Sequence, residues 1–281
     1  MPDDLRPPAG PWPRRVGVDS YAYHRLLGET RPGESRPGRL FLRGSLEAVA
    51  QARRLDLDFA LLQTCFLGDP AAFSAEAYLA EAGRLALGLS WGAPDGFAFG
   101  DRPGALEDLA AWLGPAAALG LPVIRIVAGG PAHAGRPVDA LVPLLRSACD
   151  LAGELGLQPA LENHGDLRAE SIELLLDAVG PDRLRVCFDT ANALRAGDDV
   201  GAAAERLSPA IEVLHVKDCL ASWDDAAAGP LSVAPGAGAI PLSRVLEACP
   251  RALACIELGQ LPPGSDELEL VGAYVDYLRA A

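Results

Sequence analysis

Short apolar runs alternate with helix-like segments along the whole of this 281-residue chain. Each run has the length and apolar content of a buried strand, and each is followed by a segment in which apolar residues recur at helical spacing. Strands that regularly precede helices are typical of a parallel sheet. The eight predicted strands cover residues 15–20, 58–63, 85–91, 122–127, 157–163, 184–189, 211–217 and 252–257.

Eight helices are predicted between and after these strands. Ser45 and Ser74 stand where N-caps are expected, because a hydroxyl at that position accepts a hydrogen bond from the first helical turn. Gly120, Gly156 and Gly180 stand just past helix ends, where glycine is favoured. The predicted helices cover residues 45–54, 74–84, 104–119, 137–155, 170–179, 200–208, 241–249 and 266–279.

Strict alternation leaves two architectures, an open doubly wound sheet and a closed barrel. The count of eight strands favours the barrel, and about 250 residues is the usual size of one such domain. The doubly wound alternative would carry a GxGxxG turn after its first strand, which is missing from VGVDSYAYHRLLG. We therefore predict a (β/α)8 TIM barrel, with residues 1–14 as a flexible tail and 15–281 as one catalytic domain. Long connections at 21–44 and 218–240 follow strands at the end where barrels build active sites.

Charge and composition exclude several classes of protein. A net charge of −14 opposes binding to phosphate backbones, so no nucleic-acid partner is expected. No apolar stretch approaches the roughly 20 residues of a membrane span, and the N-terminus lacks the pattern of a signal peptide. The chain is therefore expected in the cytoplasm, without a membrane partner. Six cysteines without CxxC pairing are expected to be buried, reduced thiols.

Four side chains of metal-binding type end four consecutive predicted strands. Their separations of 27, 26 and 42 residues resemble the roughly 30 residues of a strand–helix unit, so all four are expected at one mouth of the barrel. Three carboxylates and an imidazole suit one divalent cation of intermediate character; the oxygen-rich set favours Mn²⁺, with Co²⁺, Zn²⁺, Fe²⁺ or Mg²⁺ as alternatives. The predicted metal ligands are Glu162, Asp189, His215 and Glu257.

Lys217 is the only lysine among 24 basic residues. Residues two apart on a strand face the same side, so Lys217 should point where His215 points. Because lysine is a compact charge whose pKa responds to burial, a catalytic role is expected for it.

Several motifs together carry a resemblance to a known family. In order they are ALENHG before an apolar helix, CFDTANAL, LHVKD, the glycine-rich PGAGAIPL, and a strand that ends in IEL. The chain resembles the xylose isomerase-like TIM-barrel superfamily, and within it the sugar phosphate isomerases/epimerases, which include ketose 3-epimerases and inosose dehydratases. The resemblance covers residues 15–279, assigns the metal to the same four ligands, and implies a homodimer or tetramer.

The resemblance also implies a chemistry. In ketose epimerases of this superfamily the two glutamates form an acid/base pair, here Glu162 and Glu257. A metal that holds a carbonyl and the adjacent hydroxyl acidifies the C–H between them and stabilises the enediolate. One carboxylate removes the proton and the other returns it from the opposite face. The expected function is isomerisation or epimerisation of a keto sugar or cyclic polyol, the small-molecule partner.

The same first step permits another outcome. If the enolate expels a β-hydroxyl, the enzyme is a dehydratase acting on an inosose- or dehydroshikimate-like ketone, and the four ligands alone do not separate the two. Three rivals are less favoured: an abasic-site endonuclease, for which the histidines are too few; a Schiff-base aldolase using Lys217; and a barrel without catalysis.

Six further side chains are predicted to contact the substrate from strand ends. His164 should share the face of Glu162, because it lies two residues further on. The predicted substrate-binding residues are His24, Gln63, Trp91, Arg125, His164 and Asn192.

Two positions depart from the family pattern. Asn192 replaces a histidine found in many ketose epimerases three residues after the metal aspartate, and Ala237 replaces a frequent glutamate. Few cations stand where a phosphate could bind, so an uncharged substrate is expected. These cations are Arg25, Arg125, Arg195 and Lys217.

Overall fold

A computed structural model describes residues 14–221 and 229–281 of the chain. Eight parallel strands form a closed barrel in the order β1-β10-β7-β6-β5-β4-β3-β2, as the sequence predicts. The barrel strands are β1 (Val16–Asp19), β2 (Phe59–Gln63), β3 (Ala86–Ser90), β4 (Gly120–Val127), β5 (Gln158–Glu162), β6 (Arg185–Asp189), β7 (Ile211–Val216) and β10 (Leu253–Ile256).

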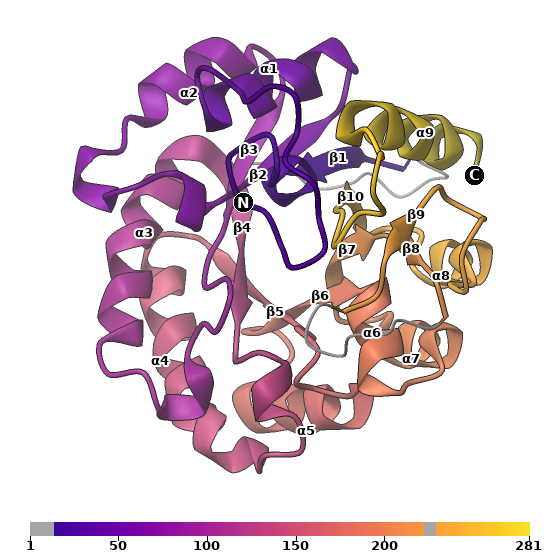
Figure 1. Ribbon diagram of the computed structural model, residues 1–281. Coiled ribbons are helices and arrows are strands. Elements are labelled where there is room, and N and C mark those ends of the chain that lie inside the picture. Colours follow the sequence, from indigo (N-terminus) through magenta and orange to yellow (C-terminus); the bar gives the residue numbers. More distant parts are fainter. Residues whose placement is uncertain (1–13, 222–228) are drawn as a thin grey trace.

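Helices surround the barrel, and the chain passes round it from β2 to β10 in sequence order (Figure 1). All eight predicted helices are confirmed, and a short one, α6, follows β6 where none was predicted. The helices are α1 (Ser45–Arg54), α2 (Ala75–Ala82), α3 (Ala105–Leu119), α4 (Leu141–Glu154), α5 (Ala169–Val179), α6 (Thr190–Ala196), α7 (Val200–Leu207), α8 (Leu242–Ala248) and α9 (Glu267–Ala280).

The helix ends follow the sequence signals in part. Gly120 and Gly180 end α3 and α5 with positive φ, as the glycine pattern predicts. The prediction for Ser45 is wrong: Gly44 is the N-cap of α1, and Ser45 is the first helical residue, whose hydroxyl donates to the Phe66 carbonyl. Ser74 does stand at the N-cap of α2, without a side-chain capping bond.

Two apolar cores hold the barrel. One fills its interior with side chains from alternate strand positions, such as Phe59 and Leu61 on β2 and Val213 on β7. The other lies between the strands and the helices. Because side chains alternate along a strand, the interior positions continue upward into polar residues at the carboxyl end of the barrel. The apolar interior thus forms the floor beneath a polar mouth.

The long connection after β7 contains a small antiparallel sheet of β8 (Asp218–Cys219) and β9 (Ser232–Val233). The Asp218 carboxylate organises the glycine-rich turn before α8, because it accepts hydrogen bonds from the backbone N–H groups of Gly236, Gly238 and Ile240 at 2.9–3.0 Å. This turn therefore folds directly onto the residue next to Lys217.

The predicted N-terminal tail falls outside the described residues except for Arg14. Its guanidinium donates to the carbonyls of Leu246 and Cys249 at 2.8 and 3.1 Å, so the chain is already attached to the barrel there. The helices of the described residues lack the combined length and apolarity that a membrane crossing requires. Five cysteines are buried and Cys65 is exposed, which corrects the expectation that all six are buried.

Candidate metal centre

The four predicted ligands meet at the carboxyl ends of four neighbouring strands. Each offers one ligand atom, and these atoms all lie within 4.8 Å of one another. The strand order makes β5, β6, β7 and β10 consecutive in the barrel wall, so Glu162 and Glu257 stand at the two ends of the row. Asp189 and His215 lie between them.

The imidazole of His215 is the centre of this cluster. Its Nδ1 lies 3.8 Å from carboxylate oxygens of Glu162 and Asp189 and 3.6 Å from one of Glu257. These separations are too long for hydrogen bonds, and neither ring nitrogen has a hydrogen-bond partner among the described residues. They suit ligands that each approach a shared ion to about 2.0–2.2 Å. The donor set therefore fits one divalent cation.

Lys217 supplies positive charge beside the same carboxylates. Its Nζ lies 2.6 Å from Oδ2 of Asp189 and also contacts Glu257. Burial disfavours the ammonium, but these two carboxylates outweigh burial and raise the pKa of Lys217. Burial raises the pKa of Glu257, but Lys217 and His215 outweigh it and lower this pKa to about 2. As predicted, Lys217 points where His215 points.

Arg125 and Asn192 hold the other glutamate. The Arg125 guanidinium bonds to Oε2 of Glu162, and the Asn192 amide donates to Oε1 at 3.1 Å. Burial alone would raise the pKa of Glu162, but Arg125 and His215 lower it well below its usual range. Both glutamates are thus held as carboxylates, each by its own cation.

Asp189 is positioned by the local fold. Its Oδ1 accepts from the Asn192 N–H at 2.8 Å and so caps α6, which leaves Oδ2 to face Lys217. The Asn163 side chain fixes the backbone of Asp189, accepting from its N–H at 2.7 Å and donating to its carbonyl at 2.9 Å. The unpredicted α6 therefore helps to position Asp189 within the candidate metal centre.

Asp19 lies on the other side of His215 and was not predicted from the sequence. Its Oδ2 is 3.9 Å from Nε2 of His215 and accepts from the Ser90 hydroxyl at 2.6 Å. At 3.9 Å no hydrogen bond joins the two side chains, so Asp19 acts on the imidazole as a nearby negative charge. The signal was available, since Asp19 ends the first strand on the interior face.

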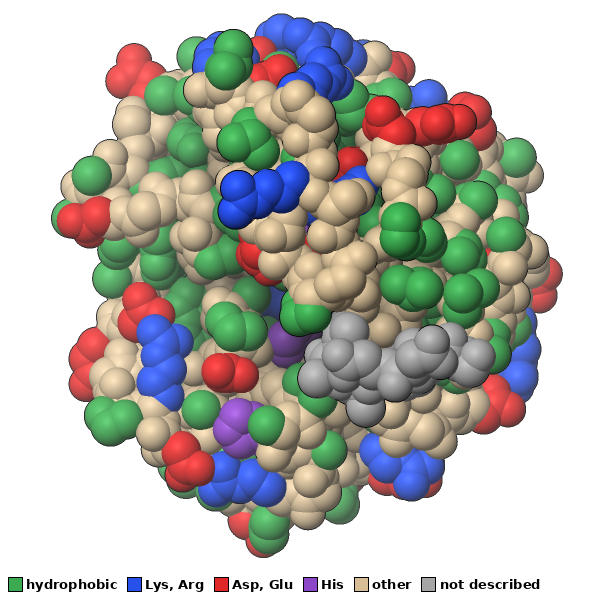
Figure 2. All heavy atoms as spheres, viewed as in Figure 1, with side chains coloured by type: hydrophobic (Ala, Val, Ile, Leu, Met, Phe, Trp, Pro, Cys, Tyr) green, Lys and Arg blue, Asp and Glu red, His purple; other side chains and the backbone are tan. Residues whose placement is uncertain are grey.

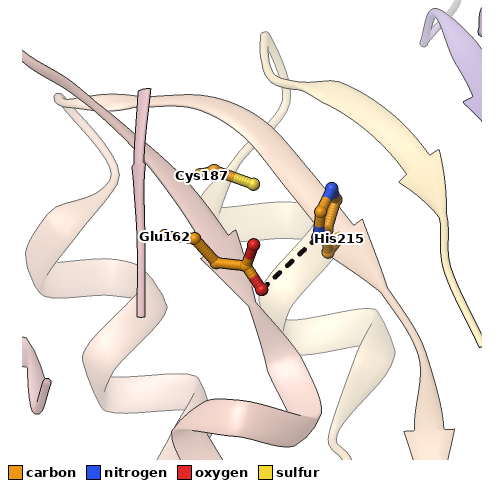
Figure 3. A group of neighbouring side chains, drawn as sticks. All are labelled: Glu162, Cys187 and His215. Carbon is orange, nitrogen blue, oxygen red and sulfur yellow. Dashed lines mark ion pairs between the residues drawn. The ribbon is translucent and has the colours of Figure 1, made fainter. Parts of the chain in front are cut away.

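Cys187 forms a second group with Glu162 and His215. Figure 3 shows the thiol and the Glu162 carboxylate directed into the same space as the imidazole. Cys187 lies two residues before Asp189 on β6, one layer deeper in the barrel, and burial raises the pKa of its thiol to about 11. Its environment favours the neutral thiol, whereas metal ligation requires the thiolate.

A cavity of about 430 Å³ opens above the centre, and Figure 2 shows this face hollowed near its middle. Of the residues predicted to contact substrate, four line it together with Lys217 and Glu257: Gln63, Arg125, His164 and Asn192. The buried Gln63 amide has no hydrogen-bond partner among the described residues, and His164 Nδ1 lies 3.1 Å from the Gly129 carbonyl.

Trp91 does not line the cavity. The interior positions of β3 include Ser90, so strand alternation turns Trp91 outward, where its indole donates to Asp108 at 3.1 Å. Only its backbone serves the site, as its carbonyl accepts from Arg125 at 3.2 Å.

His24 also lies outside the cavity lining. It is fully buried, with ring nitrogens 3.0 Å from the Tyr21 carbonyl and from the Glu34 carboxylate. The ring stacks on Tyr21, which does line the cavity. His24 therefore supports a wall residue that the sequence did not identify.

Two more lining residues, Arg31 and Arg195, come from the connection after β1 and from α6. Neither ends a strand, so the pattern that found the ligands gave no signal for Arg31. Arg195 was predicted from the sequence only as one of the few cations that could meet a phosphate. Arg25, another cation of that group, is buried and paired with Glu267.

Comparisons with known proteins agree with this geometry. The family model for xylose isomerase-like TIM barrels matches residues 50–249. No curated protein matches the sequence. The fold is similar to a solved L-ribulose 3-epimerase (TM-score 0.69, 16% identity, 95% of each chain) and to a probable 3-DHS dehydratase of petrobactin synthesis from Bacillus anthracis (0.66, 13%, 94% of this chain and 98% of that one).

A third similar structure, from Mycobacterium smegmatis, is a xylose isomerase-like TIM barrel in complex with magnesium (TM-score 0.68, 17% identity, 95% of this chain and 96% of that one). At these identities the structures establish the shared fold, while the family model spans most of the chain. The closed barrel and the matched segment agree, and the chain belongs to the xylose isomerase-like TIM barrel family.

Proposed function

We propose that this protein is a metal-dependent isomerase or epimerase of a keto sugar or cyclic polyol. The observation that carries the proposal is the placement of Glu162 and Glu257 at opposite ends of the four-strand row, with the other two ligands between them. Two carboxylates that approach one carbon from different sides can take a proton and return it.

A bound divalent ion would polarise a ketone and its adjacent hydroxyl as a Lewis acid. The chain's own groups would do the rest. Glu257 lines the cavity and can reach a carbon held above the centre. Glu162 lies at the far end of the row, where Arg125 and Asn192 fix both of its oxygens. One glutamate would remove the proton and the other would deliver it.

Lys217 would act as a hydrogen-bond donor to a substrate oxygen. Its ammonium faces the cavity and is held between Asp189 and Glu257. An amine can attack a carbonyl only in its neutral form, so this ion-paired environment favours donation over imine formation. The Schiff-base aldolase is therefore disfavoured relative to the isomerase.

Exchange of hydrogen with solvent tests the proposal. The protein is incubated in D₂O with Mn²⁺ and a panel of ketoses and inososes, and the products are read by NMR and mass spectrometry. Deuterium at a carbon beside the carbonyl is expected. Loss of water from the product would assign the dehydratase instead, and absence of both with every ketone would reject the proposal.

Glu257→Gln separates the acid/base role from the fold. The amide keeps an oxygen near the metal and loses the proton-transfer group, so deuterium incorporation should fall by at least about 100-fold. The matched control is Glu212→Gln, on β7 and half-buried outside the centre, which should exchange like the wild type. Wild-type exchange by Glu257→Gln would eliminate the two-glutamate scheme.

A further inference from the structure

A buried thiol lies beside two of the predicted metal ligands. Cys187 on β6 is the register partner of Glu162 on β5, so the two side chains stand at the same height on neighbouring strands. His215 lies on the next strand, β7, two residues beyond Val213, the register partner of Cys187. The ligand atoms of Glu162, Cys187 and His215 lie within 4.8 Å of one another, and all three side chains are fully buried (Figure 3). We call these three residues the thiol triad.

The thiol triad overlaps the four-residue centre but differs from it in chemistry. The four-residue centre offers three carboxylates and one imidazole, whereas the triad has one sulfur in place of Asp189 and Glu257. Oxygen-rich sets suit Mg²⁺ and Mn²⁺, and thiolate sulfur is preferred by softer ions such as Zn²⁺ and Cd²⁺. Because Glu162 and His215 belong to both sets, an ion in one set excludes an ion in the other. The two sets are therefore alternatives for ions of different softness.

Lys217 distinguishes the two sets further. Its ammonium contacts Oδ2 of Asp189 and Oε2 of Glu257. The same two oxygens are the ones that lie nearest Nδ1 of His215. An ion in the four-residue centre therefore shares both oxygens with the ammonium, whereas an ion in the thiol triad would leave both ion pairs of Lys217 in place.

Glu162 also keeps an oxygen available for the triad. Arg125 bonds to its Oε2. The other oxygen, Oε1, lies 3.8 Å from Nδ1 of His215 and accepts a hydrogen bond from Asn192 at 3.1 Å. A carboxylate oxygen has two lone pairs, so Oε1 can bind an ion while it keeps this hydrogen bond.

Cys187 becomes a ligand only for an ion that binds sulfur strongly. The thiolate is the form that binds metals, and an apolar, fully buried position favours the neutral thiol. A bound cation displaces the proton of a coordinating thiol, and the proton passes to solvent. A strong metal–sulfur bond offsets this cost for Zn²⁺ or Cd²⁺, whereas Mn²⁺ and Mg²⁺ should leave Cys187 protonated.

We propose that the thiol triad is a second binding mode of this centre, which takes a thiophilic divalent ion such as Zn²⁺ while the oxygen-rich set takes Mn²⁺ or Mg²⁺. The inference deepens the proposed function and rests on its metal centre, but not on the ketone chemistry. It assigns to Cys187 the discrimination between ions. An ion held by the triad leaves Glu257 paired with Lys217, so it should occupy the centre without supporting the proposed reaction.

Cadmium absorption tests the inference, because a bond between Cd²⁺ and a thiolate gives a charge-transfer band in the ultraviolet. Metal-free protein is titrated with Cd²⁺, and the band should reach the intensity of one thiolate per ion and stop growing at one Cd²⁺ per chain. Cys187→Ser and Cys187→Ala should abolish the band and weaken Cd²⁺ binding by at least about tenfold. Their Mn²⁺ binding, followed by electron paramagnetic resonance, should be little changed.

Two other cysteine variants identify the sulfur. Cys255→Ser removes a buried thiol that is the register partner of His215 and joins no such group of ligands among the described residues. Cys65→Ser removes the exposed thiol. Both variants should keep the band. A wild type without the band, or a band that both Cys187 variants retain, would overturn the inference.

Competition between ions tests the shared ligands. Cd²⁺ should displace bound Mn²⁺ one for one, because Glu162 and His215 serve both ions. Mn²⁺ that stays bound at saturating Cd²⁺ would contradict the overlap of the two sets. Deuterium exchange with Mn²⁺ tests the ketone chemistry separately: exchange without the cadmium band would keep the enzyme function and reject the thiol triad, and the band without exchange would do the reverse.

Discussion

At the scale of single residues, the ammonium of Lys217 balances the negative charge of Asp189 and Glu257. Lys217→Ala should lower the free energy of unfolding of the metal-free protein by about 3–5 kcal/mol, because Asp189 and Glu257 lose the cation that they share. Excess Mn²⁺ should recover much of this loss, since the ion brings positive charge to the same carboxylates. Urea unfolding in EDTA and in Mn²⁺ measures both values. An equal loss under the two conditions would show that Lys217 and the ion do not share these carboxylates.

The connection after β1 is an element held by one buried carboxylate. Glu34 accepts from the Arg31 and Leu261 N–H groups at 2.7 and 2.8 Å and contacts His24, joining this connection to the segment after β10. Burial raises the pKa of Glu34, but His24 and these N–H groups outweigh burial and lower it below the usual 4.5. The stabilisation is therefore complete above about pH 4.5 and is lost as the pH falls through the lower, folded-state value.

Acid should loosen this connection before the barrel unfolds. Amide hydrogen exchange in residues 21–44, corrected for the intrinsic effect of pH, should accelerate as the pH falls below about 4.5, at roughly constant far-UV circular dichroism. Glu34→Gln should show faster exchange already at neutral pH and a smaller response to acid, and Glu76→Gln, exposed on α2, is the control. Unchanged exchange of this segment in Glu34→Gln would contradict the assignment.

The turn before α8 is an element built around a glycine. A Cβ on Gly238 would lie 2.2 Å from Oδ1 of Asp218 and 2.4 Å from the Cys219 carbonyl. Gly238→Ala should therefore destabilise the protein by about 1–3 kcal/mol and displace Asp218 together with the adjacent Lys217. Gly272→Ala on α9 should be neutral or stabilising, because an added Cβ there would meet no atom of the described residues within 4 Å apart from the nearby backbone of its own helix. Thermal melts of both variants measure these effects. Equal melting temperatures would contradict the close contact between residue 238 and Asp218.

At the scale of the whole molecule, the alternation of side chains along the strands allowed both the barrel and the predicted metal ligands to be identified from the sequence. Strand alternation places every second side chain inside, so Glu162, Asp189, His215 and Glu257 could be assigned to one mouth without coordinates. The prediction that Trp91 contacts the substrate overlooked this rule, because Ser90 faces the interior and the next residue, Trp91, therefore faces outward.

Features that depend on tertiary contacts had no such signal. His24 does not line the cavity, because it pairs with Glu34, ten residues later in the sequence. Arg31 lines the cavity because the connection after β1 folds back over the mouth of the barrel. The helix α6 begins directly after β6 because the Asp189 side chain caps it. Loop paths of this kind depend on side chains far apart in the sequence, which a pattern along one segment does not contain.

The barrel as a whole is expected to bind one divalent ion where four of its strands end. Manganese binding followed by electron paramagnetic resonance tests this claim most directly, with the His215→Ala variant beside the wild type. The wild type should bind one Mn²⁺ per chain, and His215→Ala should weaken this binding by at least about tenfold while keeping the far-UV circular dichroism of the fold. A wild type that binds no Mn²⁺, or binding that His215→Ala leaves unchanged, would contradict a metal centre at these four residues.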